Sequence, residues 1–203
     1  MAEYREIFGE AIQSLASNST TIEGQIWYDT ANNVFRLQKA ALTAAWSSGA
    51  NLPGIRWNTS GAGTQTAGLV FGGATGPAGP AFLNTTFEYD GSTWTSGGNT
   101  PNSSINQFSA GIQTAAIGGG GLASGGSNTA EAYTYNGTSW TAITATPIAT
   151  KGAGAAGTST ACLIYGSDVP DSAMNQDSYY WNGSSWAEEG ALNASFQNGA
   201  AGG

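Results

Sequence analysis

The chain contains no histidine and only one cysteine, which removes the commonest general base, the commonest metal ligand and any disulfide within the chain. Cys162 lies in the apolar run 161–165, which is typical of a buried structural thiol. Charged residues make up only 9 % of the chain. The five basic residues form no cluster, so we expect neither nucleic-acid binding nor attraction to an anionic membrane; they are Arg5, Arg36, Lys39, Arg56 and Lys151.

Long apolar runs are also missing. No stretch is long enough to span a bilayer, and we expect no membrane insertion. Residues 1–6 carry charges of both signs and lack the apolar core of a signal peptide. We therefore expect a protein that is made in a cytoplasm and is not exported by the ordinary route. The net charge of −8 favours solubility and mutual repulsion between copies.

Glycine and aromatic residues are abundant, and the aromatic residues recur at a fixed distance. Trp94, Trp140 and Trp186 are each separated by 46 positions, and each ends a similar hexapeptide, at 89–94, 135–140 and 181–186. A fixed period of this size indicates one supersecondary unit that is copied in tandem. Copied units rarely carry a single asymmetric catalytic centre, so the repeat argues against an enzyme.

Each copy predicts several short strands. Aromatic residues alternate into the start of each hexapeptide, as at Phe87 and Tyr89, and such alternation indicates a strand with one aromatic face. Asp90-Gly91 and its Asn-Gly counterparts predict hairpins with type I′ turns, in which both central residues have positive φ. Upstream blocks of small residues followed by glycines predict two further strands per copy, at 63–73, 111–119 and 157–167.

Four short strands in about 46 residues are typical of a propeller blade. The order of a glycine doublet, a tyrosine and a tryptophan resembles the kelch repeat; the first two copies match at Gly72-Gly73, Tyr89 and Trp94, and at Gly118-Gly119, Tyr135 and Trp140. The third copy departs from this pattern, with Gly166-Ser167 and Trp181. The resemblance implies an all-β fold of kelch-like β-propeller blades, near 58–100, 109–146 and 152–192.

Partial copies flank these three units. Residues 46–51 match the end of a repeat, and residues 196–203 match the start of one. Propellers typically have four or more blades, so we expect an incomplete propeller. The chain is then the front part of a longer repeat protein or a shortened copy. Alternatively, several chains complete each other's sheets, because an exposed blade edge favours aggregation.

Residues 1–44 do not fit the repeat, and we expect them to form a separate N-terminal module that precedes repeats at 45–203. Residues 23–37 predict a β-hairpin with its turn at Asn32-Asn33. Upstream, apolar residues at helical spacing predict one face of a short helix; they are Tyr4, Ile7, Phe8, Ile12 and Leu15. An isolated hairpin is unstable in water, so this module must pack on the repeats, on its own copies or on another protein.

The strings Tyr4-Arg5-Glu6-Ile7 and Glu23-Gly24-Gln25-Ile26-Trp27-Tyr28-Asp29, followed by kelch-like copies, resemble virion structural proteins from tailed phages of marine bacteria. Those proteins are commonly labelled tail-fibre-like. The resemblance implies a protein of the virion whose N-terminal module binds other virion proteins. The repeats would then project outward in several copies and recognise a host-surface glycan or protein. Two alternatives stay open: a carbohydrate-binding or carbohydrate-active propeller domain, and a purely decorative virion protein.

Candidate chemical groups are few, and we expect no catalytic, cofactor or metal site. Asp168, Asp171 and Asp177 share one loop that could offer oxygen ligands to Ca²⁺, but their spacing matches no known ligand set, which favours a solvated loop. Residues 118–121 lack the Lys-Ser/Thr pair of a phosphate-binding loop. We expect the three periodic tryptophans to fill the core rather than stack on sugars. The better candidates for exposed contacts are Trp57, Phe82, Phe108 and Phe196.

Overall fold

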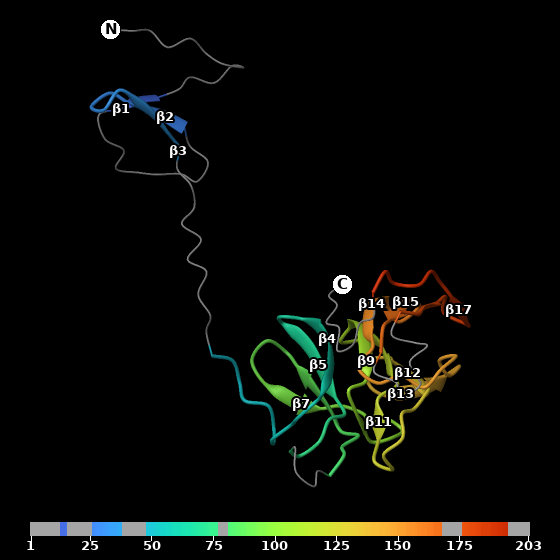
Figure 1. Cartoon of the computed structure of the whole chain (residues 1–203). Helices are drawn as coiled ribbons and strands as arrows, with labels where there is room; N and C mark the ends of the chain where they lie inside the picture. The colour runs from blue at the N-terminus through green and yellow to red at the C-terminus, as the bar shows by residue number, and fades with distance from the viewer. Residues whose placement is uncertain (1–12, 16–25, 38–47, 77–80, 168–175, 195–203) are drawn as a thin grey trace. The chain divides into compact units, whose positions relative to one another are not determined.

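The computed structural model describes residues 13–15, 26–37, 48–76, 81–167 and 176–194, and every regular element among them is a β-strand (Figure 1). The predicted all-β class is therefore confirmed. The chain divides into two compact units, Met1–Ser47 and Ser48–Gly203, which we treat separately. The predicted boundary after residue 44 lies outside the described residues. The described part contains no helix that is long and apolar enough to cross a membrane.

The first unit contains a three-stranded sheet. Strands β2 (Ile26–Asp29) and β3 (Val34–Leu37) form the predicted antiparallel hairpin, and Asn33 takes a positive φ of 55° in its turn. Strand β1 (Gln13–Leu15) pairs parallel to β2. The helix prediction is therefore wrong at Leu15, because pairing with a neighbouring strand outweighs a weak local helical pattern. Its other members, Tyr4, Ile7, Phe8 and Ile12, lie outside the described residues.

The second unit contains three four-stranded antiparallel sheets, which we call the first, second and third repeat sheets. In each one the strands pair in chain order. The first sheet comprises β4 (Ser60–Thr64), β5 (Ala67–Phe71), β6 (Thr86–Tyr89) and β7 (Trp94–Ser96). The second comprises β9 (Phe108–Ile112), β10 (Ala115–Gly119), β12 (Ala132–Tyr135) and β13 (Trp140–Ile143). The third comprises β14 (Gly154–Thr158), β15 (Ala161–Tyr165), β16 (Ser178–Trp181) and β17 (Trp186–Glu188). A short pair, β8 (Ser104–Ile105) with β11 (Leu122–Ala123), accompanies the second sheet.

The periodic tryptophans occupy the same position in all three repeat sheets. Each begins the fourth strand and pairs with the last residue of the third strand, in the pairs Tyr89–Trp94, Tyr135–Trp140 and Trp181–Trp186. The ring centroids of these pairs are 4.9, 4.9 and 5.3 Å apart, with similar tilts. The surroundings of the tryptophans within each sheet are thus matched, as the repeat predicts.

The hairpins between the third and fourth strands are present, but the predicted type I′ turn is wrong. Only the glycine has positive φ, with 92° at Gly91, 89° at Gly137 and 92° at Gly183. The preceding Asp or Asn side chain instead accepts two backbone N–H groups; Asp90 Oδ1 is 2.8 Å from Ser92 N and 2.7 Å from Thr93 N. This side-chain-capped loop needs four residues and leaves Asp90 at negative φ.

The predicted match between the glycine doublets Gly72-Gly73 and Gly118-Gly119 is wrong by two residues. Gly72 and Gly73 both have positive φ, and their counterparts in conformation are Gly120 and Gly121. Residues 118–119, the predicted match, lie inside β10. The reason is loop length: fifteen positions separate the paired residues Phe71 and Thr86, whereas thirteen separate their counterparts Gly119 and Ala132. The connection in the first copy is therefore two residues longer.

The repeat sheets pack face to face in chain order. Leu69 and Phe71 of the first sheet form one apolar core with residues of the second sheet, namely Ala116, Tyr133, Tyr135 and Trp140. A second core joins the second and third sheets through Phe108, Ala110, Ile117, Ala132, Ala153, Ala155, Cys162, Ile164, Tyr179 and Trp181. Phe71 lies 4.6 Å from Trp140, and Phe108 lies 6.1 Å from Trp186, measured between ring centroids. Trp140 therefore fills its junction, as predicted, whereas Trp186 is half-buried and packs against the edge of the second core.

We predict that the contribution of each periodic tryptophan to stability depends on whether another repeat sheet covers it. Its position within the repeat does not determine this contribution. Trp140 is buried against Phe71, whereas Trp94 has no sheet before it in the described residues and is only half-buried. Truncation of a buried tryptophan costs about 3–5 kcal/mol. Trp140→Ala should thus lower the free energy of unfolding by about 3–5 kcal/mol, and the matched control Trp94→Ala by about half of that or less. Denaturant unfolding in dilute solution measures both, and equal losses would contradict this account.

Candidate functional site

Metal and catalytic chemistry finds little support in the part of the chain that the structure describes. No three Asp, Glu or Cys side chains lie close enough there to hold a metal ion. Of the loop acids considered for Ca²⁺, Asp168 and Asp171 lie outside the described residues, and only Asp177 is described. Cys162 is fully buried, and this burial raises the pKa of its thiol to about 12. A thiol of this kind is a packing residue and a poor nucleophile at neutral pH.

The glycine run at 118–121 makes backbone hydrogen bonds and close contacts within the protein. The amide of Gly120 donates to Glu131 O at 2.8 Å, and that of Gly121 donates to Thr150 O at 2.6 Å. A Cβ at position 119 would stand 2.3 Å from Glu131 O. The glycines therefore allow close packing of backbone, and these two N–H groups are not available to a phosphate.

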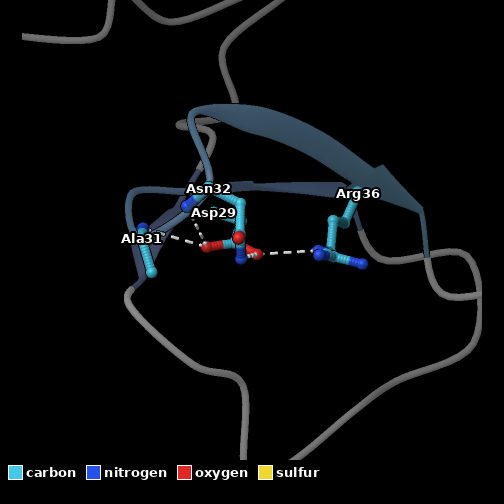
Figure 2. Close-up of polar contacts among 4 residues, drawn as sticks. All are labelled: Asp29, Ala31, Asn32 and Arg36. Atoms are coloured by element: carbon cyan, nitrogen blue, oxygen red, sulfur yellow. Dashed lines mark hydrogen bonds and ion pairs between the residues drawn. The ribbon is translucent and has the colours of Figure 1, made fainter.

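Asp29 organises the hairpin of the first unit. Figure 2 shows its carboxylate between the turn and β3, where it accepts from Asn32 Nδ2 at 2.9 Å and from Arg36 Nε at 2.7 Å. It also accepts the backbone N–H groups of Ala31 and Asn32. These bonds, chiefly that from the Asn32 side chain and then that from Arg36, lower the pKa of Asp29 to about 2. The carboxylate thereby fixes the shape of the turn.

One face of this hairpin is apolar and open to solvent. Ile26 and Phe35 lie on the same face by their register and are 52 % and 61 % exposed. Tyr28, two residues after Ile26, lies on the same face and pairs with Phe35 across the hairpin. The ring centroids of Tyr28 and Phe35 are 5.1 Å apart. Large apolar side chains that stay exposed side by side favour contact with another protein surface. We call Ile26, Tyr28 and Phe35 the hairpin face.

The second unit has a corresponding open surface on the first repeat sheet. Phe87, Tyr89 and Trp94 are half-buried, whereas their counterparts Tyr133, Tyr135 and Trp140 are buried under the neighbouring sheet. A Cβ added at Gly68 would lie 3.6 Å from Tyr89 Cβ and 3.9 Å from Trp94 Cη2, so this glycine lies beside two of the three rings. We call Phe87, Tyr89 and Trp94 the open aromatic face.

Two features cover parts of the open aromatic face. The Arg56 guanidinium lies 4.6 Å from the centroid of the Phe87 ring and donates to Gly72 O and Thr85 O. Residues 48–51 lie along the other edge, where Trp94 Nε1 donates to Ala50 O at 3.2 Å. Trp186 donates in the same way to Thr144 O, four residues beyond the tryptophan of the preceding sheet. Residues 48–51 thus take the place that a preceding repeat would occupy.

A hollow of about 370 Å³ lies among the first strands of the three sheets and extends to Trp94. Small residues of β4, β9 and β14 form most of its wall, Leu69 and Val70 of β5 form another part, and no charged side chain lines it. The hollow could admit an uncharged ligand along the Trp94 ring, and its lining includes no acidic side chain.

The aromatic residues predicted to be exposed have different outcomes. Trp57 is 40 % exposed, and Phe82 is half-buried. Phe108 is buried, so that prediction is wrong: it lies in β9 and packs near Trp186 in the core between two sheets. Phe196 lies outside the described residues. The hairpin face and the open aromatic face were both missed as surfaces, because exposure depends on which sheets surround a residue.

Comparison with protein-family models and with curated proteins finds no match for this chain.

We predict that Asp29 titrates near pH 2 in the folded chain, against about 3.9 for an unperturbed aspartate. Since its folded pKa is lowered, its contribution to stability is present above pH 4 and is lost as the pH falls toward 2. Carbon NMR of the Asp29 carboxyl measures the midpoint. Asn32→Ala should raise it most and Arg36→Gln somewhat less, while Arg56→Gln in the other unit should leave it unchanged. A midpoint near 4 in the unaltered chain would contradict the described network.

Proposed function

We propose that this chain is a non-enzymatic structural protein of a bacteriophage virion, of the tail-fibre or appendage type. The N-terminal unit attaches it to the particle, and the repeat sheets, arranged as kelch-like propeller blades, serve adhesion or recognition of the host surface. The observation that carries the proposal is the tandem copy of one sheet with matched junctions. Such an array offers extended surfaces rather than a single reactive centre.

The hairpin face supports the attachment role. Ile26 and Phe35 leave an apolar surface on a small sheet, and covering it with another virion protein would remove that surface from water. The Asp29 network favours a rigid hairpin, so little conformational freedom is lost on binding. Net charge of −8 keeps several copies of the projecting units apart until specific contacts form.

A second candidate function, carbohydrate binding, is favoured by the hollow that ends at Trp94. An indole ring beside an uncharged cavity is suited to stacking against a sugar ring. Binding on a glycan array without turnover would assign this role, which agrees with a host-recognition protein. Hydrolysis of a polysaccharide by the chain would instead contradict the non-enzymatic proposal.

The attachment proposal predicts that antibodies against this chain label purified particles of the phage that encodes it. Absence of the chain from purified virions would overturn the proposal. Phe35→Ser should then reduce the copies per particle by about tenfold or more, because burial of a phenylalanine contributes about 1.5–3 kcal/mol. The matched control is Ile55→Ser, an exposed apolar residue of the second unit, and it should leave incorporation unchanged. Quantitative immunoblots of purified particles measure both variants.

A further inference from the structure

We propose that a polar hollow beside the second repeat sheet binds a neutral pyranose sugar through Asn102 and Glu131. The hollow has a volume of about 380 Å³ and is distinct from the hollow that ends at Trp94, since the two share no lining residue. The site deepens the proposed recognition of a host surface by naming a ligand, and its biological meaning rests on that function. Sugar binding itself can be measured without any virion.

Polar side chains form most of the wall of this hollow. Five of the seven lining residues have polar side chains, namely Asn102, Ser103, Ser124, Thr129 and Glu131, and the other two are alanines. Hydroxyl and amide groups of this kind both donate and accept hydrogen bonds, as the hydroxyl groups of a sugar require. The volume lies at the lower end of the range for ligand pockets, about 300–1,000 Å³, which suits a single sugar ring.

One oxygen of the Glu131 carboxylate is held by the protein, and the other is open. Oε2 accepts from Tyr133 Oη and from Asn102 Nδ2, both at 2.5 Å. Tyr133 is buried, and this burial, followed by the bond to Glu131, raises the pKa of its hydroxyl. The hydroxyl therefore stays protonated and donates at neutral pH. Oε1 has no hydrogen-bond partner among the described residues, so it is available to a hydroxyl group of a ligand.

The backbone that carries these groups is fixed as well. Glu131 N donates to Thr129 Oγ1 at 2.9 Å, and Glu131 O accepts from Gly120 N at 2.8 Å. Asn102 is held through its carbonyl oxygen, which accepts from Thr100 Oγ1 at 3.0 Å. Since these contacts exist before any ligand arrives, binding costs little conformational freedom.

Comparison of the three copies separates this arrangement from the needs of the fold. Thr85, Glu131 and Asp177 are counterparts, because the carbonyl oxygen of each accepts the amide of a positive-φ glycine that follows the second strand. Two residues later, the copies have Phe87, Tyr133 and Tyr179. The first copy therefore has neither the acid nor the hydroxyl group.

The third copy lacks the amide. Thr146 Oγ1 donates to Ile148 O as Thr100 Oγ1 donates to Asn102 O, so Ile148 occupies the position of Asn102. The combination of amide, acid and tyrosine thus occurs in the second copy alone, although all three sheets form. Stacking of the sheets does not require it, and this favours a role in binding.

The chemistry of the wall favours a neutral ligand over an ion. No basic residue lines the hollow, and the charge of Glu131 repels an anion such as phosphate. Ca²⁺ takes about six to eight oxygen ligands, and no three acidic side chains lie together in the described part of the chain. A sugar needs no countercharge, because its hydroxyl groups donate to Oε1 and exchange hydrogen bonds with Ser103, Ser124 and Thr129.

NMR titration of the full, isotope-labelled chain tests the site. The probes are glucose, galactose, mannose and N-acetylglucosamine. We expect at least one of them to shift the signals of Asn102 Nδ2 and of the Thr129 and Glu131 amides saturably, with a dissociation constant of about 1–10 mM. Glu131→Gln and Asn102→Ala should each weaken binding by about tenfold, because each removes a hydrogen bond that involves the carboxylate charge.

Variants at the tyrosine position separate positioning of Glu131 from folding. Tyr133→Phe introduces the side chain that the first copy has at position 87, so the circular dichroism should be unchanged. Binding should weaken by about three- to tenfold, because the carboxylate loses one of its two donors. The matched controls Tyr179→Phe and Asp177→Asn change the same positions of the third copy and should leave binding unchanged.

Three results would overturn the proposal. In the first, none of the four sugars shifts these signals saturably. In the second, calcium chloride shifts them and no sugar does, which would assign a cation site. In the third, a sugar shifts the signals of Trp94 instead and binds Glu131→Gln equally well, which would assign the other hollow. Each of these results is independent of whether the chain is found on purified particles, so the sugar site and virion attachment fail in different experiments.

Discussion

The structure depends on one interaction: the aromatic face of the second and of the third repeat sheet packs against the sheet before it. The rings of Tyr135 and Trp140 lie together within one sheet, and Phe71 from the preceding sheet packs against them. Neither sheet could bury this surface alone, and isolated small sheets are only marginally stable. Stacking in chain order follows from this requirement, and it explains why tryptophan recurs at a constant position while the loops around it vary.

Sequence reasoning predicted what is repeated and local. The strands, the hairpins and the role of Trp140 in a junction follow from the period and from alternation. Turn geometry at Asp90 was missed because the side chain competes with the backbone for its hydrogen bonds. The counterpart of Gly72 was misplaced because an insertion in one loop shifts the numbering, and only strand pairing reveals the shift.

Environment, in contrast, could not be predicted from the period. Trp94 and Trp140 are equivalent in sequence, yet Trp140 packs against Phe71 of the preceding sheet, whereas no repeat sheet precedes Trp94 among the described residues. Phe108 was expected to be exposed and proves to be a core residue of β9. The Asp29 network also escaped notice, since its partners Asn32 and Arg36 converge only when the hairpin forms. The open aromatic face arises in this way, because residues at matching positions of the repeat have different neighbours.

The hairpin face and the open aromatic face differ in how far other parts of the chain already cover them. The hairpin face presents Phe35 on a sheet whose turn is fixed by a charged network, so its shape exists before a partner arrives. The open aromatic face is partly covered by Arg56 and by residues 48–51, which reduce the apolar surface in contact with water. A partner must then compete with this internal cover. A surface that binds there must replace the contact between Trp94 and Ala50 and bury the same rings, and this requirement favours selective binding.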